Sequence, residues 1–269
     1  MDCPVLRTVT SHLSLDVHQP LELIVAVAVA DGSYDRSDVL TVRSDDGPLD
    51  VVEVKSAHGG RVHRVWTPEG RVVVDYQATV TGVADVPPVD DVDLIEYRRP
   101  SRYADSDRLL AFARDQFGSL TGIALVEAVV GWVSGHVTYL TGSSVPTDGA
   151  TDTLLKRRGV CRDFAHLVVA LLRARDTPAR LASVYAPGLK PMDFHAVAEA
   201  YVDGGWHVVD ATGLAPRDAM LRIATGRDAT DTAFLSYYGG SLTMRAMTVT
   251  AAVRGALELA EVGDLRALR

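Results

Sequence analysis

The chain has 269 residues, of which 47% are hydrophobic and 23% are charged, and its 27 basic and 35 acidic side chains give a net charge of −8. This apolar content excludes a disordered or collagen-like chain, and the acidic balance argues against a protein that binds nucleic acid. The two cysteines, Cys3 and Cys161, are too few for a disulfide scaffold or a four-thiolate zinc site.

No membrane segment or export signal is expected. The longest apolar run, residues 21–30, is interrupted by Glu22 and is far shorter than a membrane-spanning helix. The first residues lack the basic segment and following apolar run that a signal peptide has. We therefore expect a cytoplasmic protein that has no membrane partner.

The N-terminal third is predicted to be β-structure, because apolar residues recur at every second position from Leu21 to about Val83. Short strands separated by Pro- and Gly-containing turns are typical of a small antiparallel sandwich, and we assign residues 1–95 to it. His58 and His63 are expected to be ordinary surface histidines, because no other metal-ligating residues cluster around them in the sequence.

Two turns predict how these strands connect. In residues 67–70 a proline stands second and a glycine fourth, which suits a tight turn. Residues 62–66 and 71–80 are therefore expected to form a hairpin. A second turn at residues 45–48 separates an expected strand over 39–42 from another over 51–54.

A connector rich in Pro and Asp lies between about Pro87 and Pro100, and beyond it the apolar period becomes helical. Residues 109–117 are expected to form a helix, and residues 123–140 a second one whose many valines depend on tertiary packing. We assign residues 96–269 to a second domain.

The chemistry concentrates between residues 159 and 213. From Cys161 onward, apolar residues fall at positions 164, 167, 168, 171 and 172, which predicts a helix that ends before Pro178. A helix N-terminus exposes free N–H groups and partial positive charge, and both favour a thiolate over a thiol. Taken alone, Cys161 is equally compatible with a nucleophile and with a small buried side chain.

A second pattern supplies partners for this cysteine. Residues 195–202 and 206–212 alternate as two strands around a turn at 203–205, so His195 and Asp210 should be near neighbours across the hairpin. A catalytic histidine needs a third group that fixes its orientation, and aspartate is the usual one. We predict a triad of Cys161, His195 and Asp210, with the sulfur about 3–4 Å from one ring nitrogen and Asp210 at the other.

Neighbouring polar residues have simpler interpretations. His166 is expected to serve packing or hydrogen bonding, and Asp163 to cap the helix in its first turn. A zinc site would require Cys161, His195 and a carboxylate to converge without paired ligands, so no metal is expected.

Three segments, 159–166, 193–202 and 206–212, resemble the motif blocks of the transglutaminase-like superfamily, and more narrowly of bacterial transglutaminase-like cysteine proteases. The first block, Gly-Val-Cys-Arg-Asp-Phe-Ala-His, is the most specific. The resemblance implies an α+β fold, with an N-terminal β-sandwich followed by a papain-like core of helices on an antiparallel sheet. It also implies a Cys161–His195–Asp210 triad that forms a thioester with a peptide or small-molecule acyl substrate, without a cofactor. The acyl acceptor would be water or an amine.

Two further positions follow from the resemblance. Tyr139 is similar in position to a recurrent tyrosine of the family and is expected to be a second oxyanion donor or a wall of the site. Val197 stands where the family usually has a tryptophan, and we expect substrate to occupy the space this leaves. The alternative is that Trp132, Tyr139 or Tyr185 fills it.

Two other functions remain compatible with these residues. The same fold could serve as a non-catalytic binding or scaffold module, although the intact triad disfavours this. It could also serve as a specialised biosynthetic acyltransferase or cyclase, which the small residue at position 197 leaves open.

Overall fold

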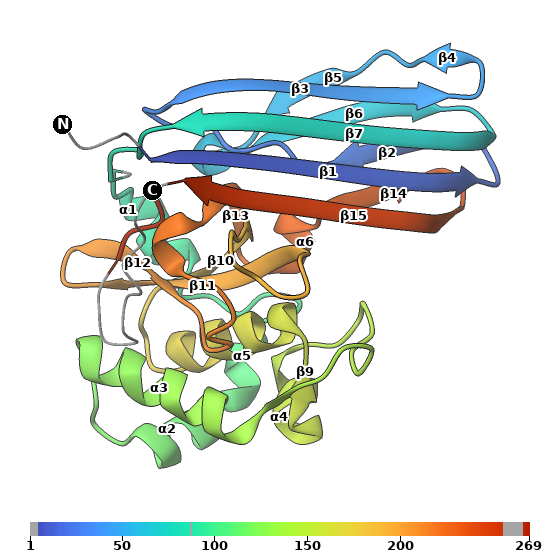
Figure 1. The fold of residues 1–269 in the computed structure, drawn as a ribbon. Coiled ribbons are helices and arrows are strands. Elements are labelled where there is room, and N and C mark those ends of the chain that lie inside the picture. The colour runs from blue at the N-terminus through green and yellow to red at the C-terminus, as the bar shows by residue number, and fades with distance from the viewer. Residues whose placement is uncertain (1–4, 87, 255–265) are drawn as a thin grey trace.

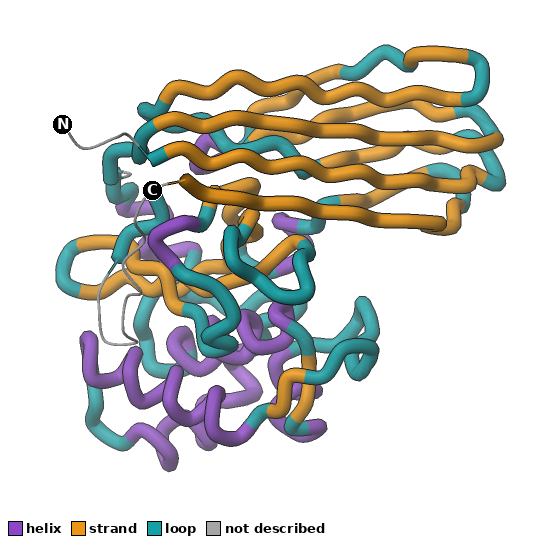
Figure 2. The backbone as a smooth tube through the Cα atoms, in the orientation of Figure 1, coloured by secondary structure: helices purple, strands orange, loops and turns teal. Residues whose placement is uncertain are grey.

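The computed structural model describes residues 5–86, 88–254 and 266–269. It has two parts, a long β-sandwich and, packed beneath it, a body in which helices cover a smaller sheet (Figures 1 and 2). The strands are β1 (Leu6–Val17), β2 (Leu21–Val25), β3 (Asp35–Ser44), β4 (Gly47–Pro48), β5 (Val52–Lys55), β6 (Arg61–Thr67), β7 (Gly70–Thr81), β8 (Thr138–Tyr139), β9 (Arg158–Gly159), β10 (Ala179–Tyr185), β11 (Phe194–Val202), β12 (Gly205–Val209), β13 (Leu221–Gly226), β14 (Leu235–Tyr238) and β15 (Leu242–Arg254).

Most helices belong to the lower body. The α-helices are α1 (Asp91–Glu96), α2 (Leu110–Phe117), α3 (Gly122–His136), α4 (Ala150–Lys156), α5 (Cys161–Arg173) and α6 (Ala229–Thr232), and the 3-10 helices are η1 (Ala57–Gly59), η2 (Ser106–Leu109) and η3 (Arg217–Ala219). The expected helix over 123–140 ends earlier, at His136, because Val137 already has extended backbone and leads into β8.

The sandwich consists of two antiparallel sheets, with strand orders β15-β1-β7-β3-β4 and β14-β2-β6-β5. Alternate side chains of each long strand point into the space between the sheets, as the buried residues Val9, Leu13, Leu15 and Val17 of β1 do. The predicted antiparallel sandwich is therefore present. The sequence analysis did not predict β1, although its residues alternate in the same way.

The predicted hairpin of residues 62–66 with 71–80 is wrong. Both segments are strands, β6 and β7, but β6 pairs with β2 and β5 in one sheet, whereas β7 pairs with β1 and β3 in the other. The turn between them carries the chain from one sheet to the other. Its residues specify a tight reversal and do not specify which strand becomes the neighbour.

The domain boundary expected at residue 95 also needs correction. The sandwich takes its last two strands from the C-terminal part of the chain, since β15 pairs with β1 along its whole length and β14 pairs with β2. The lower body therefore comprises about residues 91–232, inserted between the strands of one sandwich. In Figure 1 the red β15 lies beside the dark blue β1.

The lower body is built on a four-stranded antiparallel sheet of order β12-β11-β10-β13, against which the apolar face of α5 packs. A buried ionic cluster joins three of these strands. Glu199 of β11 accepts hydrogen bonds from Arg180 of β10 (2.9 Å) and from Arg222 of β13 (2.7 Å). Burial alone would raise the pKa of Glu199, but the two arginines lower it below its ordinary value.

The two parts share their packing. Tyr185 of β10 is fully buried, and its hydroxyl donates a hydrogen bond to the carbonyl of Val27 (2.8 Å) in the sandwich. Leu221 and Ile223 of β13 also pack into the sandwich core. The lower body therefore covers part of the sandwich interior.

His58 and His63 are not the surface residues that the sequence suggested. His63 is 4% exposed and lies 3.3 Å from Glu53, and the half-buried His58 contacts the Tyr97 hydroxyl at 3.0 Å. Burial lowers the pKa of both imidazoles. Their partners, Glu53 of β5 and Tyr97 after α1, come from other elements, so the local sequence does not reveal this burial.

Within the described residues, no single helix has both the length and the apolar character needed to cross a membrane. One pair of helical segments, Ser106–Phe117 and Gly122–His136, together has the length and composition of a membrane span, but the two segments are bent by 100° relative to each other.

Candidate functional site

Cys161 is the first residue of α5, as the sequence predicts. The carboxylate of Asp163 accepts a hydrogen bond from the Val160 N–H (2.7 Å) and another from the Ser144 hydroxyl (2.9 Å), which fixes the first turn. Asp163 therefore has the predicted capping role. Cys161 is partly exposed and lies within the partial positive charge of the helix N-terminus.

His195 and Asp210 lie together, as the expected hairpin requires. His195 is the second residue of β11 and Asp210 directly follows β12, and the two strands pair in the register that brings these positions close. Nε2 of His195 lies 2.9 Å from Oδ2 of Asp210. Both side chains are almost fully buried, and Thr212 holds the other carboxylate oxygen through its N–H and its hydroxyl.

The second ring nitrogen of His195, Nδ1, is the one available to Cys161. It is buried and makes no hydrogen bond of regular geometry within the described residues. Burial opposes the charged imidazolium, but interactions with Asp210 and with the Cys161 thiol raise the pKa of His195 to about 10. The structure thus brings all three predicted residues together, with a loose contact between thiol and imidazole that is common in unliganded sites.

Tyr139 lies beside Cys161, at the end of the short parallel pairing of β8 with β9. Burial raises the pKa of its hydroxyl to about 12, while the backbone N–H of Cys161 acts in the opposite direction as a hydrogen-bond donor to it. The hydroxyl therefore keeps its proton at neutral pH. Tyr139 does not line the cavity that opens at Cys161.

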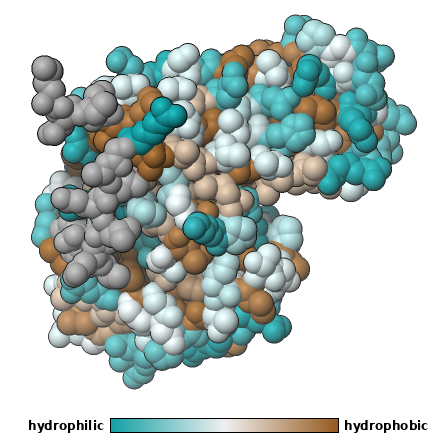
Figure 3. Space-filling view, viewed as in Figure 1, coloured by the Kyte–Doolittle hydropathy of each residue, from teal (hydrophilic) through white to brown (hydrophobic). Residues whose placement is uncertain are grey.

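A cavity of about 570 Å³ opens at Cys161 and His195 between the lower body and the sandwich. Its upper wall comes from the segment around β14 and from Met247 of β15, and Figure 3 shows the molecule hollowed below the overhanging end of the sandwich. Its lining includes Arg102, Arg162, Asp193, Phe194, Phe234 and Tyr238.

Sequence reasoning missed the upper wall and the two arginines. Phe234 and Met247 lie far along the chain from Cys161 and reach the site only because β14 and β15 return to the sandwich. Arg162 was visible inside the most specific motif, next to the cysteine, and this adjacency was the one signal that could have drawn attention to it.

The expectation that Val197 opens into this cavity is wrong. Val197 is 1% exposed and packs in an apolar cluster with Val184, Val208 and Met220, and it does not line the cavity that holds Cys161. Val197 lies two residues after His195 on β11 and pairs with Ala182 of β10 in the middle of the sheet. The small side chain at this position is accommodated by the surrounding core.

His166, also on α5, has the structural role expected of it. It is fully buried, its Nε2 accepts a hydrogen bond from the Ala229 N–H (3.0 Å), and its ring stacks on Tyr103 at 5.5 Å. Burial lowers the pKa of this imidazole, so it stays neutral. His166 therefore ties α5 to the segment that begins α6.

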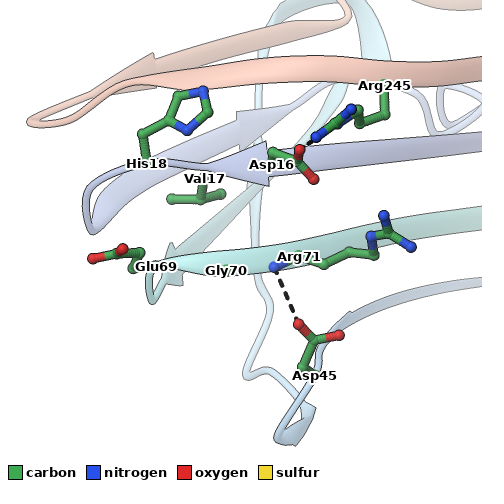
Figure 4. A pocket seen from close by; sticks show the side chains of 8 residues that line it. All are labelled: Asp16, Val17, His18, Asp45, Glu69, Gly70, Arg71 and Arg245. Atoms are coloured by element: carbon green, nitrogen blue, oxygen red, sulfur yellow. Dashed lines mark hydrogen bonds and ion pairs between the residues drawn. The ribbon is translucent and has the colours of Figure 1, made fainter.

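A separate hollow of about 560 Å³ lies on the sandwich, where Arg245 pairs with Asp16 and the Arg71 N–H bonds Asp45 at 3.4 Å (Figure 4). No cysteine is among the residues that line it. No group of three or more metal-ligating side chains occurs within the part of the chain that the structure describes. The cavity at Cys161 is therefore the candidate active site.

Comparisons with known proteins agree with this choice. A family model for the transglutaminase-like superfamily matches residues 110–211, which include Cys161, His195 and Asp210. The crystal structure of a putative cysteine protease from Cytophaga hutchinsonii is similar with a TM-score of 0.86 and 32% sequence identity, over 98% of this chain and 96% of that one.

Mycobacterial proteins match over shorter regions. An uncharacterised protein of Mycobacterium leprae is 28% identical over 116 residues, which are 40% of this chain and 42% of that protein. An uncharacterised protein of Mycobacterium tuberculosis is 46% identical over 48 residues, which are 18% of this chain and 15% of that protein. The matches thus span less than half the length of these relatives.

Proposed function

The chain belongs to the transglutaminase-like superfamily, and we propose that it is a thiol-dependent acyl-transfer enzyme in which Cys161 is the nucleophile. The proposed substrate is an amide or related acyl compound. The acyl group passes from the substrate to the Cys161 sulfur, and then to water or to an amine. The similarity to a putative cysteine protease along nearly the whole chain supports this class of reaction.

In the proposed reaction, His195 takes the thiol proton and the Cys161 thiolate attacks the substrate carbonyl carbon. The C–S bond forms as the carbonyl π electrons move to oxygen, and the backbone N–H of Cys161 stabilises the resulting oxyanion. The imidazolium then protonates the leaving amine as the C–N bond breaks. Attack by water or an amine on the thioester, with His195 as base, releases the product and restores the thiol.

The observation that carries the proposal is the position of His195, which has Asp210 at Nε2 and Cys161 beside Nδ1. An imidazole whose pKa is about 10 is protonated at neutral pH and stabilises a neighbouring thiolate. The N-terminus of α5 acts in the same direction. These interactions are those expected of an activated cysteine rather than of a buried structural one.

Tyr139 is proposed as the second group at the oxyanion. Its protonated hydroxyl accepts a hydrogen bond from the Cys161 N–H, so a substrate oxygen that displaces the hydroxyl from this N–H would meet both donors. Replacement by phenylalanine is therefore expected to slow acyl transfer more than it slows alkylation of Cys161, since alkylation forms no oxyanion.

The proposal predicts that Cys161 reacts with iodoacetamide at neutral pH faster than Cys3 does. Peptide mapping of the labelled protein separates the two sites, and Cys3 lies outside the described residues. His195→Ala is the matched variant, and it should slow labelling of Cys161 by about tenfold or more because the thiol pKa rises without its imidazolium partner. Equal labelling of both cysteines, unaffected by His195→Ala, would favour a non-catalytic binding module.

A further inference from the structure

The cavity beside Cys161 is lined by two arginines that form no ion pair within the described residues. Arg102 lies in the segment before η2 and is exposed, and its guanidinium sits over the Tyr103 ring at 5.3 Å. Within the described parts of the chain, this guanidinium forms neither an ion pair nor a hydrogen bond. Its donors are therefore free to bind a group that enters the cavity.

Arg162 follows Cys161 in the first turn of α5, and among the residues that the structure describes only one nitrogen of its guanidinium, Nη2, makes hydrogen bonds. Its Nη2 donates to the Ser144 hydroxyl (2.8 Å) and to the Val145 carbonyl (3.0 Å). Its Nε is buried and has no hydrogen-bond partner. The Nη2 atom is thus held by neutral groups, and Arg162 is among the residues that line the cavity.

The acidic residues nearby are engaged elsewhere. Asp163 accepts hydrogen bonds from the Val160 N–H and the Ser144 hydroxyl, and Asp148 pairs with Lys156 at 2.6 Å. Neither forms an ion pair with Arg162, although the charge of Arg162 acts to lower the pKa of both carboxyl groups. Asp193 is the one acidic side chain among the lining residues, and burial raises its pKa. The imidazolium of His195 is matched by the Asp210 carboxylate and the Cys161 thiolate, so the groups that the lining offers to an anion are the two guanidiniums, against the single carboxylate of Asp193.

Another part of the lining is apolar and aromatic. The rings of Phe194 and Phe234 stack with centroids 4.9 Å apart, and Tyr238 and Met247 continue this wall along the sandwich. An occupant of the cavity would therefore meet both cationic donors and a hydrophobic surface.

Resting on the proposed function, we propose that the cavity selects an acyl donor that bears a carboxylate group, which Arg102 and Arg162 bind. The apolar part of the donor lies against Phe194 and Phe234. Guanidinium groups bind carboxylates through paired N–H donors, and a concave site with low-dielectric walls strengthens the attraction. Both arginines are thereby assigned as specificity-determining residues.

Two alkylating reagents test this proposal without knowledge of the substrate. Iodoacetate carries a carboxylate and iodoacetamide is neutral, and both react with the same thiolate. We measure the rate constants at Cys161 by peptide mapping at low ionic strength and form their ratio, so that any change in the thiol pKa cancels. The ratio should exceed that of free N-acetylcysteine and should fall as salt is added, because salt screens charges beyond about 10 Å at 0.1 M.

Arg102→Gln and Arg162→Gln should each lower the ratio by about threefold to tenfold, the effect expected for removal of one charge several ångströms from the reagent. Arg162→Lys keeps the charge but loses the fork of donors to Ser144 and Val145, so it should keep most of the preference if charge is what matters. Arg114→Gln, an exposed arginine on α2 far from the cavity, is the matched control and should leave the ratio unchanged.

The possible outcomes separate this inference from the proposed function. If Cys161 reacts rapidly with iodoacetamide but the Arg102→Gln and Arg162→Gln proteins keep the wild-type ratio, the carboxylate preference is overturned and the nucleophile stands. If Arg162→Lys loses the preference as fully as Arg162→Gln, while Arg102→Gln has no effect, Arg162 acts through structure alone and the inference also fails. If neither reagent labels Cys161 selectively, the proposed function itself fails.

Discussion

At the scale of single residues, the site depends on how burial and hydrogen bonding compete at His195. Burial disfavours the imidazolium, yet Asp210 and Cys161 together raise the pKa of His195 from its ordinary 6.5 to about 10. Because the folded pKa is the higher one, this interaction contributes its full stability below about pH 6.5. That contribution is lost as the pH rises through about 10. The charged pair is thus maintained throughout the neutral range.

Asp210→Asn is expected to lower the pKa of His195 by about one to two pH units. A hydrogen bond to a charged group is worth about 1.5–3 kcal/mol, and one pH unit corresponds to about 1.4 kcal/mol. Turnover should fall by about 10²–10⁴, because the general base, His195, loses the group that orients it and fixes its tautomer. An NMR titration of His195 measures the pKa directly.

Thr212→Val is the control for this substitution, since it removes a hydroxyl bonded to Asp210 but keeps the charge. Its effect on the pKa of His195 should be clearly smaller than that of Asp210→Asn. An unchanged histidine pKa in the Asp210→Asn protein would show that the carboxylate does not stabilise the imidazolium.

At the scale of elements, the start of α5 depends on close packing around Gly159. A Cβ atom at this position would lie 2.5 Å from the Cβ of Asp163, whose carboxylate is fixed by its bonds to Val160 and Ser144. Room for the capping aspartate, rather than an unusual backbone angle, is therefore the reason for glycine here. The cap in turn fixes the position of Cys161.

Gly159→Ala is expected to destabilise the protein by about 1–3 kcal/mol, the usual cost of overpacking, and to slow alkylation of Cys161 because the first turn of α5 must shift. Gly131→Ala in α3 is the matched control. Its added Cβ would meet nothing within 4 Å, and it should stabilise the helix by about 0.5–1 kcal/mol. Urea unfolding and labelling rates of the two variants check both expectations.

The type and position of individual helices and strands were predicted best from the sequence. Which strands pair with one another in a sheet could not be predicted from it. The alternation in residues 71–80 gives strand β7, and the spacing after Cys161 gives α5, because both patterns are local consequences of burying one face. The turn at 67–70 is also local, so it could not show that β6 and β7 belong to different sheets.

The same distinction between local and long-range contacts applies to the candidate site. His195 and Asp210 lie on consecutive strands joined by a short turn, so their proximity follows from hairpin register. Phe234 and Met247 reach the cavity only through the closing of the sandwich, which depends on contacts far apart in the sequence. The substitution at Val197 misled for a similar reason, since its packing partners come from other strands and a separate loop.

At the scale of the whole molecule, the two parts are not independent units. β15 pairs with β1 from one end to the other, and the sandwich core extends onto β10 and β13 of the lower body. A fragment of residues 1–95 lacks two strands, and a fragment of residues 96–269 carries β14 and β15 without a sheet to join.

Neither fragment alone is therefore expected to unfold cooperatively, whereas the two fragments mixed together should associate and recover part of the native circular dichroism. Thermal unfolding of each fragment, of the mixture and of the intact chain provides the comparison. A fragment of residues 96–269 that folds by itself and labels selectively at Cys161 would contradict this expectation.

The return of β14 and β15 to the sandwich also has a consequence for how the protein is made. During synthesis on the ribosome, Cys161, His195 and Asp210 emerge well before Phe234 and Met247, which form the cavity wall. Strand β1, the first to emerge, must wait for β15 before its second edge is covered. A growing chain thus holds Cys161 without its cavity, and the proposed acyl transfer would require β14 and β15 to have left the ribosome and joined their sheets.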